Sequence, residues 1–171
     1  KVDQESAKLI HANNVKRVIR ALEYYKQTGQ KISQHNEEEK RKMSPYDFTY
    51  FVLNNDRSLL FQRIDKRVDQ MMEEGLVEEV RSLYHAGYGR DLVSMQGLGY
   101  KEILSYLEKN CSLEESVYRL KRDTRHFAKR QLTWFKREKE VTWIDKNKLH
   151  YDNELILNKI LEELRKKKIY G

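Results

Sequence analysis

The chain has 171 residues, of which 39% are hydrophobic and 36% are charged, so it can build a packed core and is excluded from the class of membrane-buried proteins. Its 34 Lys and Arg residues exceed its 27 Asp and Glu residues, and the net charge of +7 permits a polyanionic partner without requiring one. The single cysteine, Cys111, excludes an internal disulfide and fits a reducing compartment, and the five histidines show no zinc-type spacing.

The N-terminal region is predicted to be helical. Residues 5–10 and 14–28 have the sequence character of helices, and either Asn13 or Asn14 can cap the second one. Residues 33–44 are polar and nearly without core residues, which indicates an exposed helix end or a mobile connector. Because the chain has no initiator Met and opens within this helical region, we expect it to be part of a longer protein.

A strand is predicted after Pro45, which ends any preceding helix. Residues 46–56, YDFTYFVLNND, are rich in aromatic and β-branched residues and favour a buried strand. Asp56 is placed to cap a long helix over residues 57–74. The remaining elements are predicted in this order: a helix at 76–86, a loop leading to Gly99, a helix at 100–109, a helix through Arg137 that begins with a Ser112–Glu115 capping box, a strand at 141–145 and a helix at 152–168.

The fold class predicted from these elements is mainly α with two short strands. Two strands rarely form a stable sheet by themselves. We therefore expect the strands at 46–56 and 141–145 to join further strands from sequence outside the given chain.

The long helix that follows Ser112 carries a cationic face. With about 100° of turn per residue, this face spans roughly 80°. It contains Arg122, Arg125, Lys129, Thr133 and Lys136, and the opposite side holds Leu113, Val117, Leu120, Phe127, Trp134 and Phe135. A solvated face tends to interleave Glu with Lys, whereas this face places like charges close together, where they repel each other. A solvated face is the usual interpretation of a charged helix stripe. The repulsion lowers the weight of that interpretation here, because bound phosphates would remove it, and a nucleic-acid backbone is the alternative.

Two further basic clusters are present. Lys16, Arg17 and Arg20 share one side of the second predicted helix, where a solvated face is the simpler interpretation. Arg63 and Arg67 lie one turn apart on the long helix after the first strand, and they repel each other unless an anion or a carboxylate meets them. A diphosphate suits the fork-like donors of arginine, and ion pairs with acids elsewhere in the fold are an equally open alternative.

Gly97 and Gly99 lie just before the helix predicted at 100–109. Glycines let a backbone approach a ligand and a helix N-terminus favours anions, so the stretch SMQGLGYK can form either an anion site or a plain turn. The GxxxxGK[ST] motif of a Walker A loop occurs nowhere in the chain.

Several stretches, in this order, resemble the tRNA dimethylallyltransferases, also called tRNA isopentenyltransferases. They are IHANNVKRVIRALE (10–23), DRSLLFQRIDKRVDQMMEEGLVEEVRSL (56–83), QGLGYKEILSYL (96–107), KRDTRHFAKRQLTWFKR (121–137) and VTWID (141–145). The chain looks like the second half of a bacterial-type member and lacks the family's N-terminal P-loop half. The resemblance implies that residues 1–45 are the rear part of a helical insertion domain that binds the anticodon loop. Residues 46–171 would then belong to a P-loop-type α/β core with a parallel sheet.

The resemblance also implies a reaction. A dimethylallyl group moves from dimethylallyl diphosphate to N6 of the adenosine 3′-adjacent to the tRNA anticodon, and Mg²⁺ assists by neutralising the diphosphate. The implied partners are the tRNA anticodon stem-loop and dimethylallyl diphosphate. We expect a cytoplasmic monomer that does not bind membranes.

Residue roles follow from the same resemblance. Arg67 matches the family arginine that contacts the substrate diphosphate, where it would stabilise the charge of the leaving group. The residues that match tRNA-contacting stretches of the family are Lys16, Arg17, Val18, Ile19 and Arg20; Gln96, Gly97, Leu98, Gly99, Tyr100 and Lys101; and Lys129, Arg130, Gln131, Leu132, Thr133, Trp134, Phe135 and Lys136. Trp134 and Phe135 are expected mainly to anchor their helix to the core. The general base and the metal ligands are expected outside this chain.

Other classes of function stay open on the sequence alone. A non-catalytic RNA-binding module predicts salt-sensitive tRNA binding with no requirement for a diphosphate. A helical scaffold with solvated charges predicts no tRNA binding even at low salt. A free adenine nucleotide is an alternative acceptor, although it has little use for three separated basic stretches.

Overall fold

The computed structural model describes residues 2–138 and 140–167. The chain forms two compact units, Lys1–Asp47 and Phe48–Gly171, whereas the sequence predicted a boundary between residues 45 and 46. The described residues are mainly helical and contain two short strands, which confirms the predicted fold class. None of the described helices combines the length and the apolar character that crossing a membrane requires.

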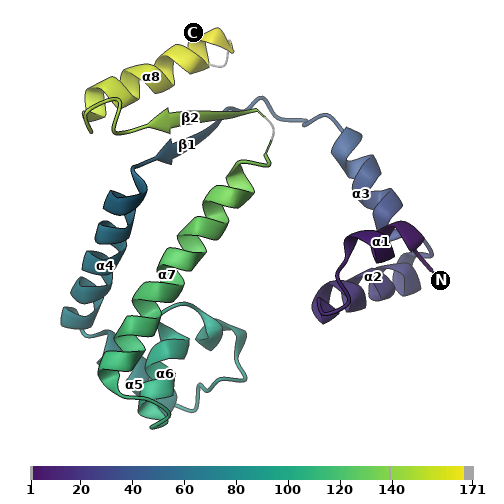
Figure 1. The fold of residues 1–171 in the computed structure, drawn as a ribbon. Coiled ribbons are helices and arrows are strands. Elements are labelled where there is room, and N and C mark those ends of the chain that lie inside the picture. The colour runs from purple at the N-terminus through teal and green to yellow at the C-terminus, as the bar shows by residue number, and fades with distance from the viewer. Residues whose placement is uncertain (1, 139, 168–171) are drawn as a thin grey trace. The chain divides into compact units, whose positions relative to one another are not determined.

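The described residues of the N-terminal unit form α1 (Gln4–Leu9), α2 (Val15–Thr28) and α3 (Ile32–Arg41) (Figure 1). Asn14 precedes α2, as predicted, but its side chain makes no capping hydrogen bond. α3 is a separate helix rather than a connector, and ion pairs such as Arg41–Glu37 along one face support it. Ser6 is the one buried residue in the described part of this unit, so apolar burial contributes little to its stability.

The second unit contains the other elements of the described chain. They are β1 (Tyr50–Asn54), α4 (Arg57–Glu73), α5 (Leu76–His85), the short 3₁₀ helix η1 (Val93–Gln96), α6 (Tyr100–Leu107), α7 (Leu113–Phe135), β2 (Val141–Asp145) and α8 (Asn153–Lys166). Asp56 caps α4 as predicted and accepts the N–H of Ser58 at 2.8 Å. Of the predicted capping box, the Ser112 half forms, because the Ser112 hydroxyl accepts the N–H of Glu115 at 3.2 Å, whereas the Glu115 carboxylate pairs with Arg119.

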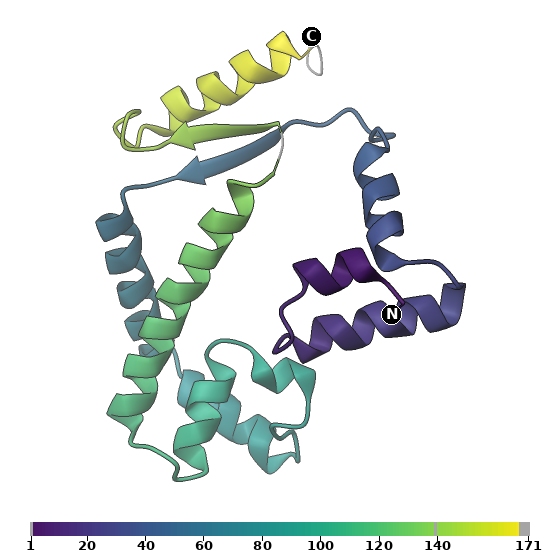
Figure 2. The same cartoon turned by 45° about the vertical axis from the view of Figure 1, so that its right-hand side comes forward.

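The core of the second unit lies among α4, α5, α6 and α7. α4 and α7 run side by side from the strand pair towards α5 and α6 (Figures 1 and 2). The buried cluster consists of Val68, Leu76, Val80, Met95, Ile103, Leu104 and Leu120. Because burial of each such side chain stabilises the fold by roughly 1.5–3 kcal/mol, this cluster determines which faces of α4 and α7 meet.

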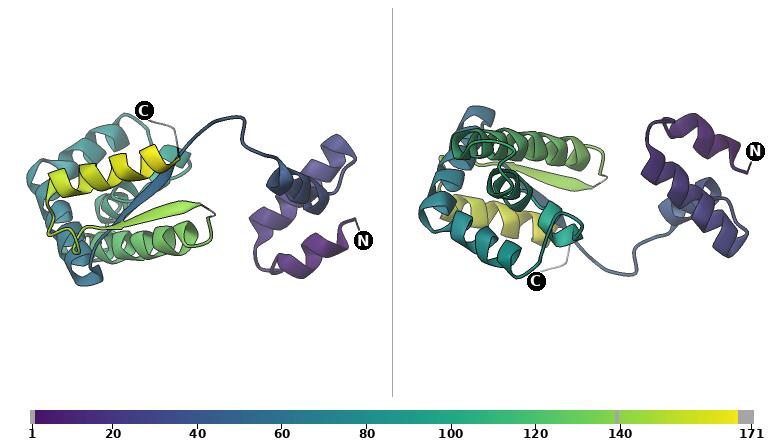
Figure 3. Two further views of the ribbon diagram at one scale, coloured as in Figure 1. Left: turned by 90° about the horizontal axis from the view of Figure 1, so that it is seen from above. Right: turned by 90° about the horizontal axis from the view of Figure 1, so that it is seen from below.

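β1 and β2 form a parallel pair in which Tyr50 is opposite Val141 and Asn54 is opposite Asp145. α8 runs along this pair, as the views from above and below show (Figure 3). The prediction of a buried strand was wrong, because Val52 is the one buried residue of β1 and its neighbour Leu53 is 53% exposed. Parallel sheets normally have both faces covered by other elements. In the described residues the sheet consists of two strands, and Leu53 on one face of β1 is left exposed.

Candidate nucleic-acid interface

Part of the predicted cationic face of α7 is already paired with carboxylates of α4. Arg125 Nη1 lies 2.5 Å from Asp65 Oδ1, and Lys121 Nζ lies 2.5 Å from Asp69 Oδ1. The two cations are four residues apart on one face of α7, and the two acids are four residues apart on one face of α4. We call these four residues the α4–α7 ladder. The prediction that Arg125 belongs to an uncompensated row was therefore wrong, because an acid of the neighbouring helix neutralises it.

Arg122 is also paired, in this case with the next residue. Its Nε donates to Asp123 Oδ1 at 2.8 Å, which raises the pKa of Arg122 and lowers the pKa of the Asp123 carboxyl. Lys101 Nζ lies 4.0 Å from the other oxygen of Asp123. This part of α7 is therefore a region of mixed charge and not the purely cationic face that the sequence predicted.

The C-terminal half of α7 and the two residues that follow it keep cations without a described partner. Lys129, Arg130, Lys136 and Arg137 are exposed, and no carboxylate of the described residues lies within ion-pair distance of them. The guanidinium of Arg130 lies over the ring of Phe127, 5.7 Å from its centroid. A phosphate that approaches this end of the helix meets unpaired positive charge.

Trp134 is 53% exposed, so the prediction that it anchors α7 to the core was wrong. Its ring meets Phe135 edge-on at 5.1 Å, and half-buried Phe135 packs edge-on against Tyr50 of β1 at 5.9 Å. Of the two residues expected to anchor α7, Phe135 therefore makes the packing contact and Trp134 does not. A hollow of about 490 Å³ beside the indole is lined by His126, Lys129, Arg130, Thr133, Trp134 and Arg137. An exposed indole among free cations is the combination that binds single-stranded nucleic acid, and we call Lys129, Arg130, Trp134, Lys136 and Arg137 the α7 free surface.

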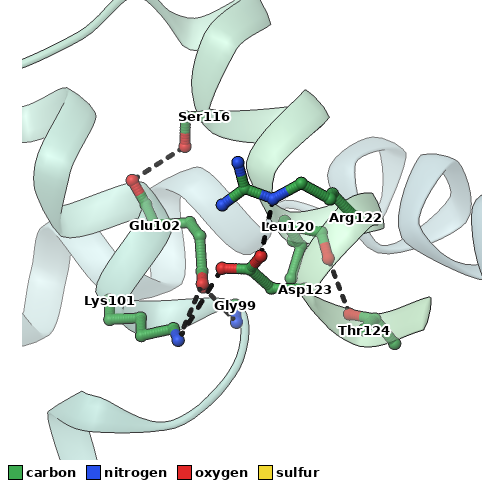
Figure 4. Close-up of polar contacts among 8 residues, drawn as sticks. All are labelled: Gly99, Lys101, Glu102, Ser116, Leu120, Arg122, Asp123 and Thr124. Atoms are coloured by element: carbon green, nitrogen blue, oxygen red, sulfur yellow. Dashed lines mark hydrogen bonds and ion pairs between the residues drawn. The ribbon is translucent and has the colours of Figure 1, made fainter. Parts of the chain in front are cut away.

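The start of α6 does not offer an open anion site. The Gly99 N–H donates to Glu102 Oε2 at 2.9 Å, so the helix's own carboxylate occupies the position that an anion would take (Figure 4). Gly99 is buried and has a φ of 100°, a conformation that favours glycine. Of the two predicted alternatives, the plain turn into a helix is therefore correct.

A polar network between α6 and α7 surrounds Glu102 (Figure 4). The hydroxyl of fully buried Ser116 donates to the Glu102 carbonyl at 2.8 Å. Glu102 is 5% exposed, and its Oε1 accepts no hydrogen bond but lies 3.3 Å from Lys101 Nζ, an ion pair with poor hydrogen-bond geometry. Because Lys101 lies between the carboxylates of Glu102 and Asp123, it is less available to a phosphate than an unpaired lysine.

The other predicted residues of this stretch differ in accessibility. Leu98 packs against the core, and the hydroxyl of half-buried Tyr100 bonds to Glu79, which raises the pKa of Tyr100. Gln96 and Gly97 are exposed. Gln96 and Gly97 are therefore the positions of the stretch that are most open to a ligand.

Arg67 lies on the exposed side of α4, and its side chain has no ion pair or hydrogen bond with the described residues. Arg63, one turn earlier, places its guanidinium over the Tyr151 ring, 5.4 Å from the centroid. Ion pairs from these two arginines to acids, the alternative left open by the sequence, are not observed in the described part of the chain. The nearby Asp65 pairs with Arg125 instead. Arg67 keeps the free charge that a diphosphate contact requires.

In the N-terminal unit, α2 exposes its basic side. Lys16, Arg17 and Arg20 are exposed and have no ion pair with a described residue. Val18 is half-buried, and Ile19 is 48% exposed. A hollow of about 1080 Å³ is lined by residues of α1, α2 and α3, including Arg17 and Arg20 but not Lys16.

Sequence reasoning missed the acids that organise these surfaces. Asp65 and Asp69 recur four residues apart on α4, a signal that could have indicated an acidic face opposite α7. Asp3 stands directly before α1, where its residue type alone indicates a cap. Its contact with Ser33 has no local signal, because the two residues are far apart in the sequence.

No group of three or more His, Cys, Asp or Glu side chains in residues 2–138 and 140–167 is arranged to hold a metal ion. Mg²⁺ usually keeps several waters and binds one or two carboxylates together with substrate phosphates.

The chain is similar in sequence to known proteins over nearly its whole length. The sequence model of a family described as IPP transferase matches residues 1–138. A tRNA dimethylallyltransferase of Lachnoclostridium phytofermentans is 59% identical over 167 residues, which cover 98% of this chain and 53% of that protein.

Solved structures match it as well. A tRNA delta(2)-isopentenylpyrophosphate transferase of Staphylococcus epidermidis has a TM-score of 0.68 and 39% identity, covering 96% of this chain and 53% of that chain. A eukaryotic dimethylallyltransferase acting on tRNA has a TM-score of 0.71 and 32% identity, covering 84% of this chain and 38% of that chain. The chain therefore spans about half the length, or less, of these relatives.

Proposed function

Because the chain belongs to the IPP transferase family, we propose that the protein of which it spans about half transfers a dimethylallyl group to tRNA. The donor is dimethylallyl diphosphate, and the acceptor is N6 of the adenosine 3′-adjacent to the anticodon. N6 forms a bond to the allylic carbon while the bond from that carbon to the diphosphate oxygen breaks. The diphosphate leaves, and the proton of N6 passes to a general base outside this chain.

The observation that carries the proposal is the 59% identity to a tRNA dimethylallyltransferase over 98% of this chain. The guanidinium of Arg67, which has no partner in residues 2–138 and 140–167, fits the same reaction. As the C–O bond breaks, negative charge grows on the leaving diphosphate, and a fixed arginine stabilises that charge more than it stabilises the ground state. Two parallel N–H donors also hold a phosphate in one orientation.

The RNA contacts are proposed for three stretches, Lys16–Arg20, Gln96–Lys101 and Lys129–Lys136. In the second stretch, exposed Gln96 and Gly97 make the contact. At the last of these stretches, the cations of the α7 free surface supply the phosphate contacts, and Trp134 offers a face on which an unpaired base of the anticodon loop can stack. The target adenosine leaves its stack to reach the allylic substrate. Arg122 and Arg125 have internal partners and take no direct part in RNA binding.

The remaining assignments are part of the same proposal. Residues 1–45 belong to a helical insertion that grips the anticodon loop, and residues 46–171 belong to the transferase core, where β1 and β2 join further parallel strands. The proposal includes Mg²⁺ as a cofactor of the whole protein, held by residues outside those described. The protein acts in the cytoplasm as a monomer.

Substitution of Arg67 by Ala in the complete protein tests the catalytic assignment. We expect transfer of labelled dimethylallyl groups to an anticodon stem-loop to fall by about 100-fold, the order seen when one donor to developing negative charge is removed. The matched control is Lys66→Ala, which removes the adjacent exposed cation of α4. Unchanged transfer by Arg67→Ala contradicts the assignment. Binding of tRNA by a wild-type protein that transfers nothing favours the non-catalytic RNA-binding module instead.

A further inference from the structure

The carboxylate of Asp3 caps two helices at once. Its Oδ1 accepts the backbone N–H of Ser6 at 3.0 Å and the hydroxyl of Ser33 at 2.8 Å. Its Oδ2 accepts the hydroxyl of Ser6 at 2.8 Å and the backbone N–H of Ser33 at 3.0 Å. Ser6 lies in the first turn of α1 and Ser33 in the first turn of α3, so one side chain serves the N-termini of both helices.

This contact replaces a cap that α3 lacks. Lys31 stands at the N-cap position of α3 and makes no capping hydrogen bond with its side chain. The free N–H groups at the start of a helix carry partial positive charge, and here two such ends meet one carboxylate. Burial by itself raises the pKa of Asp3, but the hydrogen bonds from Ser6 and Ser33 outweigh it and hold the pKa far below its usual value of 3.8.

The Asp3 contact also closes a loop of chain that contains the whole of α2. Asp3 and Ser33 are 30 residues apart, and α2 (Val15–Thr28) lies between them. The second tie within this unit is the stack of Tyr24 on His35, whose ring centroids are 5.0 Å apart and which joins α2 to α3. Since Ser6 is the one buried residue of the unit in the described range, these polar and aromatic ties replace an apolar core.

Two arginines of α2 lie in the same environment as this contact. The hollow of about 1080 Å³ in the N-terminal unit is lined by Arg17 and Arg20 and also by Asp3, Ser6 and Ser33. When α1 and α3 separate, the walls of this hollow separate too, and the two guanidinium groups lose their fixed surroundings. The Asp3 contact and the two arginines of α2 therefore border the same hollow.

We propose that Asp3 is a positioning residue for tRNA capture: by capping α1 and α3 together it holds α2 so that Lys16, Arg17 and Arg20 face the RNA in one arrangement. The inference rests on the proposed function, in which these three side chains contact the anticodon arm. It adds a residue that touches neither RNA nor diphosphate. Its action on binding passes through the shape of the N-terminal unit.

The direction in which RNA affinity changes when Asp3 is substituted separates this proposal from a purely electrostatic effect of its charge. Loss of a negative charge from an RNA-binding unit should strengthen the binding of a polyanion. The positioning role predicts the opposite, weaker binding, for Asp3→Ala and Asp3→Asn. Glu5→Gln is the matched control, because it removes the same charge from an exposed side chain whose described partner is Lys8 at 2.8 Å.

The experiment measures KM for an anticodon stem-loop RNA, KM for dimethylallyl diphosphate and kcat in the complete protein. For Asp3→Ala we expect KM for RNA to rise by about tenfold, the order that follows from losing helix caps. KM for the diphosphate and kcat at saturating RNA should stay unchanged. Asp3→Asn should fall between wild type and Asp3→Ala, because Asn keeps one capping oxygen. Glu5→Gln should leave KM for RNA unchanged or lower it.

Ser33→Ala provides a second variant with no change of charge. It keeps the backbone N–H of Ser33 and removes one hydrogen bond, so it should raise KM for RNA less than Asp3→Ala does. If Asp3→Ala fails to fold, the test rests on Ser33→Ala. An unchanged KM for RNA in folded Ser33→Ala then overturns the proposal. Tighter RNA binding by Asp3→Ala overturns it as well. Absence of tRNA binding by the wild-type protein overturns the proposed function, and this inference with it.

Discussion

Two pairs of charges on α7 should behave in opposite ways when they are neutralised. Lys129→Gln with Arg130→Gln removes two cations that have no carboxylate partner among the described residues. Lys121→Gln with Arg125→Gln removes the same net charge from the same helix, but both cations are held at 2.5 Å by acids of α4. We expect the first double variant to lose RNA affinity and the second to lose stability.

The size of the RNA effect follows from counterion release. Each phosphate contact contributes roughly 0.7–0.9 to the slope of log K against log of the salt concentration. Loss of two contacts should therefore make the slope for Lys129→Gln/Arg130→Gln shallower by about 1.4–1.8. The slope for Lys121→Gln/Arg125→Gln should stay close to that of the wild type, because its cations were already neutralised within the fold.

The stability effect should show the reverse order. The side chains of Arg125 and Asp65 are 24% and 37% exposed, so solvent screens their attraction. We therefore expect a loss of about 0.5–1 kcal/mol for each broken ion pair of the α4–α7 ladder, at the upper end of the range for exposed pairs. Lys129→Gln/Arg130→Gln breaks no ion pair in the described residues and should unfold at nearly the wild-type temperature.

The assay is a fluorescence titration of an anticodon stem-loop RNA at several salt concentrations, together with thermal unfolding of the same protein samples. Equal slopes for the two double variants refute the division of α7 into a paired half and a free half. If Lys121→Gln/Arg125→Gln is the one double variant with a shallower slope, the paired half of α7 binds the RNA and the assignment is reversed. Substitution of Arg122, Arg125 and Lys129 together cannot separate the two effects, since it breaks ion pairs and removes a free cation at once.

Two further predictions concern stability and protonation. Gly99→Ala should lower the free energy of unfolding by about 1–3 kcal/mol, because the φ of 100° strains a residue that has a side chain. The space around the new Cβ is sufficient, so the backbone strain alone causes the loss. Gly97 has a negative φ, and Gly97→Ala should be nearly neutral in the same thermal melt. The carboxyl of Glu162, hydrogen-bonded to Lys166 and Lys159, has its pKa lowered to about 2. These ion pairs therefore contribute stability above pH 4.5 and lose it as the pH falls towards 2, and NMR titration should find the midpoint returning towards 4.5 in Lys159→Gln/Lys166→Gln.

The helices and their ends could be predicted because their signals are local. Asp56 and Ser112 cap helices within three residues of themselves, so the residue types alone indicate where the helices begin. The strand at Val141–Asp145 was found in the same way, from a short β-branched and aromatic run. The burial of β1 could not be inferred, because it depends on which other elements cover the sheet and not on the strand's own residues.

The partners of the charged residues could not be predicted because they depend on packing between helices. Arg125 and Asp65 are 60 residues apart, and they meet because the core around Val68 and Leu120 fixes which faces of α4 and α7 touch. A helical wheel of α7 alone shows a cationic face and contains no information about a neighbouring acidic one. The exposure of Trp134 was missed for the same reason, since an aromatic residue on the apolar side of a helix is buried only if another element covers it.

One physical rule explains the outcomes for the charged residues of α7 and for the start of α6. A cation or a helix N-terminus attracts an external anion strongly only where no internal carboxylate already neutralises it. On α7 this rule removes Arg122 and Arg125 from the RNA-binding face, and at the start of α6 it removes the N–H of Gly99. The cations that remain, Lys129 and Arg130 above all, are those for which phosphate is the available counter-charge. The RNA-binding surface of a charged helix is therefore located by its unpaired cations, and a count of its basic residues overestimates it.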